Sequence, residues 1–342
     1  MPPGSLGHHI PRHLSEIRTL IAAARACSLP TEPQHGELRR RIPMIAGVPK
    51  AMHRERIGVV GLGRMGSAIA ERLASQGYQV TGWSRRGLTM ADGTALGIAV
   101  AADLGYLAAE ADILILALMD EEAVAAVLTA LAGHDLANRL IVETSTVGPD
   151  IIRHHAPSLA AAGGSAIDAP ISGGPDLLRI GRVGFYIGGS ETDVARFRPV
   201  AEALSDRIHH VGALGDGATA KLVNNMMLLG IWQTLKEALQ LGQAAGLTRE
   251  TMLAFLEGRP AASSAMRSRL PVILGQSDTV GFSLSGVVKD ARVVAALAEA
   301  LQLDLPATQA ARQSFEAVEA KGYGEADLAM MVRIATQGKD NA

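Results

Sequence analysis

Between residues 56 and 211, short runs rich in valine, isoleucine and leucine alternate with helix-like segments rich in alanine, leucine and glutamate. No other feature of the sequence restricts the fold as strongly, because this alternation is typical of strand–helix–strand units, which build a parallel sheet covered by helices. Asp120 is expected to cap the helix after the third strand. The sequence predicts an α/β fold with strands at residues 57–60, 79–83, 113–118, 140–143, 166–168, 184–188 and 208–211.

The pattern changes after Gly217. Residues 218–245 have helical periodicity with almost no helix breaker, and the segments from there to residue 334 are also mostly helical, separated by Pro260, Pro271 and Pro306. Residues 1–54 are rich in arginine and proline and match neither pattern, although residues 14–26 have the spacing of one amphipathic helix. We therefore expect a poorly ordered N-terminal extension (1–54), an α/β domain (55–213) and an all-helical domain (214–342). Met52 is a candidate start of translation.

The composition argues against several classes of function. The formal net charge of the 342 residues is −2, and positive and negative side chains are interspersed, so nucleic acid is not expected as a partner. The longest apolar runs are far shorter than the roughly 20 residues that cross a bilayer, so no membrane span is expected. Cys27 is the only cysteine, which excludes an intrachain disulfide and favours a reducing compartment, the cytoplasm. No metal site is predicted.

The stretch GLGRMG, residues 61–66, follows the first expected strand and precedes a helix-like segment. An ordinary strand-to-helix turn can carry the same glycines, but this context is the one in which they bind the pyrophosphate of a dinucleotide. Gly61 permits the tight turn, Gly63 lets the backbone approach the phosphates, and Gly66 lets the helix pack closely on the strand. The predicted pyrophosphate turn consists of Gly61, Leu62, Gly63, Arg64, Met65 and Gly66.

The end of the second strand indicates which dinucleotide is bound. An acidic residue about 20 residues after the glycines would bind the ribose hydroxyls of NAD. Here the sequence reads GWSRR, and Ser84, Arg85 and Arg86 offer a hydroxyl and two cations to a 2′-phosphate. The alternative is that the two arginines are solvated loop charges. We predict NADP, with NADPH as the reduced form.

The stretch DAPISGGP, residues 168–175, places adjacent glycines after another expected strand. The backbone amides of Gly173 and Gly174 and the hydroxyl of Ser172 could bind a carboxylate there. A glycine-rich turn without a ligand is the alternative, because such loops are common in α/β proteins.

The stretch GDGATAKLVNN, residues 215–225, lies at the expected join between the domains. Lys221 and Asn225 are four residues apart and share one face of a helix. The lysine can give a proton to an oxygen as hydride reaches the adjoining carbon, while the amide orients that oxygen. The alternative is a surface lysine beside an unrelated asparagine.

Together with VVKDAR (residues 287–292), these stretches resemble the β-hydroxyacid dehydrogenase family, which includes 3-hydroxyisobutyrate dehydrogenases and tartronate semialdehyde reductases. The resemblance covers about residues 56–334. It implies a Rossmann domain joined by a long helix to an all-helical domain, a homodimer, and catalysis between the domains.

The resemblance also implies roles for individual residues. Lys221 matches the catalytic lysine and Asn225 its supporting asparagine. The remaining matches are the substrate-carboxylate loop of Ser172, Gly173 and Gly174, Thr146 near the nicotinamide, Leu118 and Met119 along the cofactor, Lys289 closing the cleft, and Asp327 in a structural role. The sequence departs from the family pattern at residues 119–121, and at Glu143 and Thr144 before the Ser-Thr pair.

The function expected from these features is reversible, NADPH-linked reduction of a small carboxylate-bearing carbonyl, a semialdehyde, to a β-hydroxy acid. An imine reductase is the first alternative, although such enzymes commonly carry Asp or Tyr in place of Lys221. A 6-phosphogluconate dehydrogenase is a weaker one, because the chain is short and has no evident sugar-phosphate cluster. A non-catalytic NADP-binding sensor would need neither the carboxylate loop nor the lysine. The sequence leaves the individual substrate open.

Overall fold

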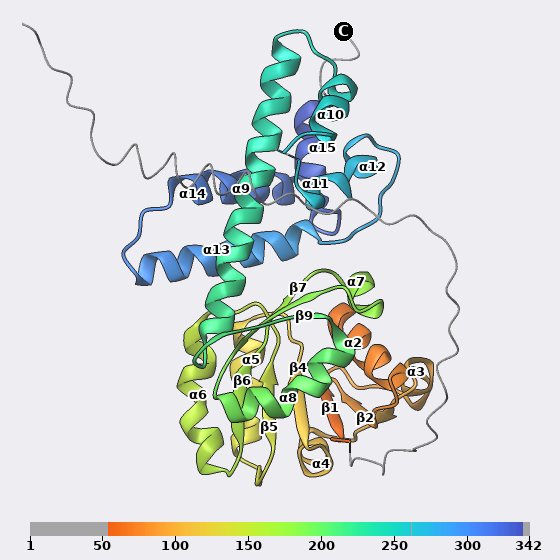
Figure 1. The fold of residues 1–342 in the computed structure, drawn as a ribbon, viewed down its shortest axis with the longest axis vertical. Coiled ribbons are helices and arrows are strands. Elements are labelled where there is room, and N and C mark those ends of the chain that lie inside the picture. Colours follow the sequence, from red (N-terminus) through yellow and green to blue (C-terminus); the bar gives the residue numbers. More distant parts are fainter. Residues whose placement is uncertain (1–53, 261, 338–342) are drawn as a thin grey trace, which may run out of the picture. The chain divides into compact units, whose positions relative to one another are not determined.

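The computed structural model describes residues 54–260 and 262–337, so the expectations for residues 1–53 lie outside the described residues. Within them, nine strands form one sheet in the order β3-β2-β1-β4-β5-β6-β8-β7, and β9 pairs with β8 (Figure 1). The strands are β1 (Ile57–Val60), β2 (Val80–Trp83), β3 (Ala99–Val100), β4 (Ile113–Leu116), β5 (Leu140–Glu143), β6 (Ser165–Asp168), β7 (Ile171–Ser172), β8 (Gly184–Gly188) and β9 (Arg207–Gly212). All seven predicted strands are present, which confirms the α/β fold.

The sheet is mostly, but not wholly, parallel. β8 runs antiparallel to both β6 and β7, and β9 then runs parallel to β8. Antiparallel neighbours can be joined by a short connection, whereas parallel neighbours need a longer crossover. Only the two-residue strand β7 and the short helix α7 (Pro175–Arg179) lie between β6 and β8, so β8 returns beside β6 in the opposite direction.

Helices cover both faces of this sheet (Figure 1). Side chains alternate between the faces along each strand, so Ile113 and Ile115 of β4 enter one core and Leu114 and Leu116 the other. The first core also takes apolar side chains from α2 (Arg64–Ser75), α7 and α8 (Glu191–Leu204). The second core takes them from α4 (Leu104–Glu110), α5 (Glu121–Ala132) and α6 (Pro149–Ala161). As expected, Asp120 caps α5 by accepting a hydrogen bond from the N–H of Ala123 at 2.9 Å.

The helical part begins with α9 (Asp216–Ala244), whose 29 residues span about 44 Å. Trp232 and Leu239 of this helix enter a third core with Phe315. Pro271 and Pro306 lie in the first turns of their helices, where a missing N–H costs nothing. The other elements are α3 (Met90–Leu96) in the sheet domain and α10 (Arg249–Glu257), α11 (Ser264–Arg267), α12 (Leu270–Ile273), α13 (Leu284–Ala300), α14 (Pro306–Val318), η1 (Glu319–Tyr323) and α15 (Met330–Thr336).

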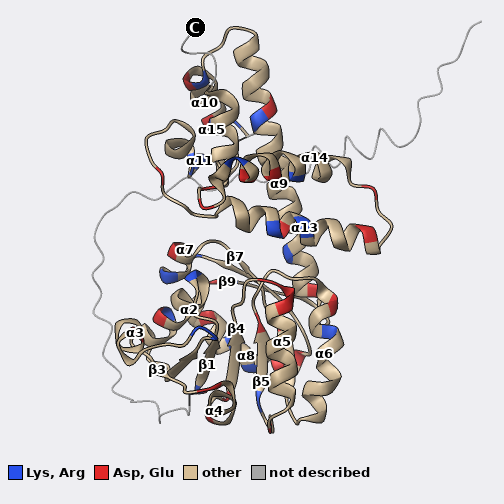
Figure 2. Ribbon diagram, turned by 180° about the vertical axis from the view of Figure 1, so that it is seen from behind, with Lys and Arg blue, Asp and Glu red and all other residues tan. Residues whose placement is uncertain are grey.

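Positively and negatively charged residues are interspersed along the described elements (Figure 2). No helix in residues 54–260 and 262–337 is both long enough and apolar enough to cross a membrane.

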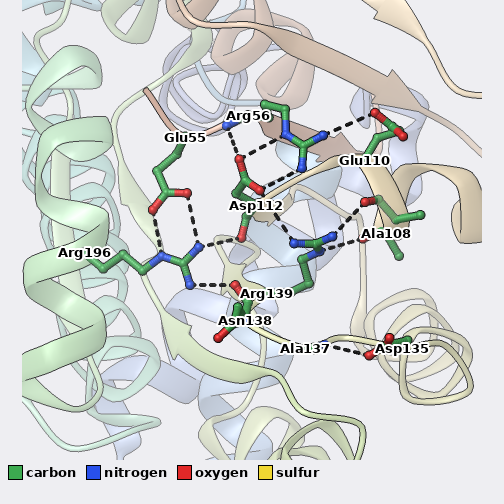
Figure 3. A network of polar contacts seen from close by, with 11 residues as sticks. Glu55, Arg56, Ala108, Glu110, Asp112, Asp135, Ala137, Asn138, Arg139 and Arg196 are labelled. Atoms are coloured by element: carbon green, nitrogen blue, oxygen red, sulfur yellow. Dashed lines mark hydrogen bonds and ion pairs between the residues drawn. The ribbon is translucent and has the colours of Figure 1, made fainter. Parts of the chain in front are cut away.

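A network of charged side chains lies at the amino ends of β1 and β4 (Figure 3). Arg56 donates to both carboxylate oxygens of Asp112 at 2.9 Å, and Arg139 approaches the same carboxylate at 3.6 Å. Arg196 on α8 pairs with Glu55 and also donates to the carbonyl of Asp112. Ligands of such sheets bind outside the opposite, carboxyl ends of the strands. This network therefore stabilises the amino ends of the strands, and the candidate site is expected at their carboxyl ends.

Candidate active site

The glycine turn after β1 has three positions with different spatial demands. Gly61 has φ +91°, and a Cβ there would lie 2.6 Å from the carbonyl oxygen of Ala117. A Cβ on Gly66 would lie 1.8 Å from the carbonyl oxygen of Gly61, so α2 can pack on the turn only with glycine at that position. Around Gly63, nothing lies within 4 Å of an added Cβ. Gly63 is also the N-cap of α2 and offers no side-chain cap, so the first amides of the helix are available to an anion.

The other residues of the predicted cofactor site lie around this turn. Leu118 would be the nearest side chain to a Cβ on Gly61, at 2.8 Å, whereas Met119 is mostly exposed. Arg64 donates to the carbonyl oxygen of Val280 at 2.7 Å, which joins the glycine turn to the helical part. The arrangement fits a dinucleotide pyrophosphate.

The loop after β2 carries Ser84, half-buried, and Arg85 and Arg86, both exposed. Neither arginine forms an ion pair within the described part of the chain. The first acidic residue after β2 is Asp92, and its carboxylate is bonded to the backbone N–H and hydroxyl of Thr89 in the capping box of α3. No carboxylate at the end of β2 is therefore free to bind the ribose hydroxyls.

Lys221 lies in the second turn of α9 and is only 8% exposed. It has no hydrogen-bond or ion-pair partner among residues 54–260 and 262–337. Burial lowers the pKa of its ammonium group from the usual value, the positive charge of Lys289 lowers it further, and the negative charge of Asp290 opposes both. A buried amine without a described partner and with a lowered pKa gives up its proton more readily than an exposed lysine does.

Asn225 lies one turn beyond Lys221 and is fixed by α13. Its Nδ2 donates to Oδ2 of Asp290 at 2.7 Å. Lys289, the neighbouring residue, pairs with Asp290 Oδ1 at 2.7 Å and donates to the carbonyl oxygen of Thr146 at 2.6 Å. This Asn225–Thr146 chain joins α9, α13 and the turn after β5.

The predicted carboxylate loop, residues 172–174, also lies close to the helical part. Ser172 ends β7 and is half-buried. Gly173 has φ +132°, and a Cβ there would lie 2.9 Å from Val183 Cγ1. A Cβ on Gly174 would lie 2.9 Å from the carbonyl oxygen of Gly281, which follows the residue bound by Arg64. Both loops of the sheet domain thus meet the segment before α13.

Asp168, to which the sequence reading gave no role, caps α9 from the end of β6. Its two carboxylate oxygens accept the N–H groups of Gly215 and Ala218, each at 2.6 Å. The side chain is buried, and this burial outweighs the hydrogen bonds and raises its pKa to about 6. Asp168 therefore fixes the start of the lysine-bearing helix against the strand that leads into the carboxylate loop.

Sequence reasoning gave no role to four further residues near the carboxyl ends of the strands: Asp290, Glu143, Tyr186 and Asn224. Asp290 is 4% exposed, and its position beside Lys289 in a helix of otherwise apolar inward residues was a usable signal. Glu143 is buried at the end of β5 and was noted only as a departure. The hydroxyl of Tyr186 donates to Oδ1 of Asn224, and Nδ2 of Asn224 donates to Oδ1 of Asn225; no local pattern indicates these contacts.

Asp327 accepts hydrogen bonds from Arg269 and from the N–H groups of Gly281 and Phe282.

Known proteins resemble both parts of the chain. Residues 56–212 match the family model for the NAD binding domain of 6-phosphogluconate dehydrogenase, and residues 215–335 match the model for the NAD-binding domain of NADP-dependent 3-hydroxyisobutyrate dehydrogenase. The 2-(hydroxymethyl)glutarate dehydrogenase of Eubacterium barkeri is 30% identical, over 82% of this chain and 95% of the relative. The 2-hydroxy-3-oxopropionate reductase of Escherichia coli is 29% identical, over 81% and 96%.

A solved structure of Mycobacterium tuberculosis 3-hydroxyisobutyrate dehydrogenase with L-serine superposes with a TM-score of 0.75 at 26% identity, covering 82% of this chain and 98% of that one. The fold, the glycine turn and these relatives define an NAD(P)-dependent oxidoreductase that acts on CH–OH groups. The chain belongs to the β-hydroxyacid dehydrogenase family, with 3-hydroxyisobutyrate dehydrogenases among its relatives.

Proposed function

We propose that this protein is an NADPH-dependent reductase that interconverts a small semialdehyde carrying a carboxylate and the corresponding β-hydroxy acid. The observation that carries the proposal is Lys221, a buried lysine without a described partner, one turn from an asparagine that α13 holds in place. A non-catalytic sensor would have no use for this arrangement. Lysine at this position favours a carbonyl substrate, whose oxygen accepts the proton, over an imine substrate.

Each group would act on a defined part of the substrate. The bound cofactor supplies or accepts hydride. Ser172 and the amides of Gly173 and Gly174 would hold the carboxylate and thereby fix the carbonyl carbon. Lys221 would give its Nζ proton to the developing alkoxide, and its lowered pKa reduces the cost of that transfer. Asn225, fixed by Asp290, would orient the same oxygen.

The cofactor's place follows from the two loops of the sheet. The pyrophosphate would lie on the amides at the start of α2, within residues 61–66, and its 2′-phosphate would lie beside Ser84, Arg85 and Arg86. Leu118 and Met119 would flank the cofactor, with Thr146 and Lys289 on its nicotinamide side. The absence of a free carboxylate after β2 in the described structure supports NADP over NAD.

We also propose a homodimer in the cytoplasm, with domains at residues 55–213 and 214–342. Val223, Met227 and Leu241 on α9 are 55%, 60% and 74% exposed. Met227 and Leu241 follow Val223 by four and eighteen residues, so turns of about 3.6 residues bring all three to one face of the helix. An exposed apolar face on a long helix is typical of a subunit interface. The single cysteine supports a reducing compartment.

Lys221→Ala tests the catalytic assignment. We expect turnover of small aldehyde acids such as succinic, methylmalonic and tartronic semialdehyde to fall roughly 10²–10⁴-fold, while NADPH binding stays nearly unchanged, because a proton donor acts mainly in the transition state. Lys236→Ala is the matched control, since Lys236 lies on the same helix and, within the described residues, donates a hydrogen bond to Ser314 alone. Near-normal turnover of Lys221→Ala would contradict the role of the lysine. Cofactor binding by the wild type without turnover of any carbonyl or imine would favour the sensor.

A further inference from the structure

Glu143 is a buried carboxyl group that the proposed mechanism does not use. It ends β5 and is 2% exposed. Its Oε1 accepts the backbone N–H of Ser145 at 2.5 Å, whereas its Oε2 is buried and has no hydrogen-bond partner within the described residues. An ionised carboxylate oxygen left without a donor in such surroundings is costly. A protonated Oε2 avoids most of that cost.

The charged groups around Glu143 reinforce this preference. Asp168 is its register partner on β6, also buried and acidic, and Lys289 approaches from α13 but is already paired with Asp290. Burial, with a smaller contribution from the charge of Asp168, raises the pKa of Glu143 to about 7, while Lys289 and the bonds from Ser145 act in the opposite direction. Glu143 is therefore close to exchanging its proton at neutral pH, and a small change in local charge can decide its state.

The position of Glu143 places it on the nicotinamide side of the proposed cofactor site. The dinucleotide lies across the point where the strand order reverses, which here is β1, between β2 and β4. Its phosphorylated ribose belongs at the end of β2, so its other half belongs at the ends of β4 and β5. Glu143 is in register with Leu116, the last residue of β4, and it supports the turn that carries Thr146.

The nicotinamide ring changes charge in the reaction: the oxidised ring carries one positive charge and the reduced ring none. We propose that Glu143 responds to this change, being neutral when the reduced cofactor is bound and ionised when the oxidised cofactor is bound. The inference rests on the proposed cofactor site. The step is a proton exchange only: the O–H bond of Glu143 breaks as oxidised cofactor binds, the proton passes to solvent, and no electron moves.

Reciprocal linkage gives the expected direction. If oxidised cofactor favours the ionised carboxylate, a rise in pH must favour oxidised over reduced cofactor. We expect the ratio of the dissociation constants, oxidised over reduced, to fall about tenfold between pH 6 and pH 8 in the wild type. The 2′-phosphate is common to both forms, so its own titration largely cancels in this ratio.

The test is to measure both dissociation constants from pH 5.5 to 8.5, without substrate, for the wild type, Glu143→Gln and Glu121→Gln. Glutamine keeps an oxygen for the N–H of Ser145 but does not titrate, so the ratio should become nearly independent of pH. Glu121 is the matched control because it also accepts a backbone N–H from the turn after β5, that of Gly148 at 2.7 Å, but its side chain is exposed. Glu121→Gln should retain the wild-type slope.

Calorimetry of the wild type alone provides a measurement that does not depend on the folding of a variant. Titrations at pH 7 in two buffers of different ionisation enthalpy should show proton release with oxidised cofactor and none, or uptake, with reduced cofactor. Equal proton counts for the two forms would overturn the proposal. An unchanged slope in Glu143→Gln would also overturn it, because the titrating group would then be Asp168 or another residue. A wild type that binds neither form at any pH would instead overturn the proposed function, and this inference with it.

Discussion

At the residue scale, the site combines groups that the sequence could indicate with groups that it could not. Helical spacing alone put Lys221 and Asn225 on one face, and the structure places both in the buried part of α9. Asp168 could not be assigned, because the amides that it binds lie 47 and 50 residues away in the chain. A carboxyl group at the end of a strand has no local pattern that reveals such a partner.

The two arginines after β2 are predicted to select the cofactor. Arg85→Ala combined with Arg86→Ala should raise KM for NADPH by about 10- to 100-fold, because charge-assisted hydrogen bonds contribute roughly 1.5–3 kcal/mol. KM for NADH should change little, since NADH has no 2′-phosphate. Arg207→Ala, at another exposed arginine, serves as the control. A wild type that prefers NADH in steady-state assays would refute the NADP assignment.

Glu143 should also make stability depend on pH. Its pKa is about 7 in the folded protein and near 4.5 when unfolded, so the unfolded chain loses this proton first as pH rises. Stability from this group is therefore complete below about pH 4.5 and is lost progressively up to about pH 7. Glu143→Gln should gain about 3 kcal/mol relative to the wild type between pH 4 and pH 8, measured by urea unfolding. A constant difference across this range would show that Glu143 does not titrate as described.

At the scale of elements, long periodic segments were predictable and short ones were not. The predicted helix 218–245 corresponds to α9, and the predicted strands recur within a few residues of their expected ends. β3 and β7 have two residues each, which is too few for any periodicity, and the antiparallel direction of β8 depends on its pairing with β6 rather than on its own residues. The order and type of the long elements could therefore be predicted from local sequence, whereas the two shortest strands and the direction of β8 could not.

The first turn of α9 should tolerate no side chain at Gly217. A Cβ there would lie 2.4 Å from the carbonyl oxygen of Tyr186 and 2.8 Å from Oδ2 of Asp168. Gly217→Ala should therefore destabilise the protein by about 1–3 kcal/mol and displace Lys221. Gly258→Ala is the control, because its φ is −86° and an added Cβ meets nothing within 4 Å, so its stability should change by less than about 1 kcal/mol. Equal melting temperatures for the two variants would contradict the close approach.

At the scale of the whole molecule, the sequence predicted a sheet and a helical part joined by one helix, but it predicted few of the contacts between them. Only Lys289 was expected to reach across, whereas Arg64 and Gly174 also meet residues 280 and 281. Such contacts depend on how two folded parts approach each other. Neither hydrophobic periodicity nor a motif records that approach.

The proposed dimer predicts the effect of a single charge on α9. Met227→Glu should convert a dimer to a monomer in sedimentation experiments, because the substitution would bury an unpaired carboxylate in an apolar interface. Met90→Glu, at another mostly exposed methionine, should leave the assembly unchanged. A Met227→Glu protein with the sedimentation coefficient of the wild type would place the interface elsewhere.

The length of α9 gives it the properties of a lever. Asp168 binds the first amides of the helix, and Lys221 lies only a few residues beyond them, whereas Leu241 lies near the opposite end of the helix. Any tilt of the helix therefore moves Lys221 much less than it moves the residues near Ala244. The proposed proton donor therefore lies at the end of α9 that Asp168 holds, so its alignment with the carboxyl ends of the strands depends least on the position of the distant half of the helix.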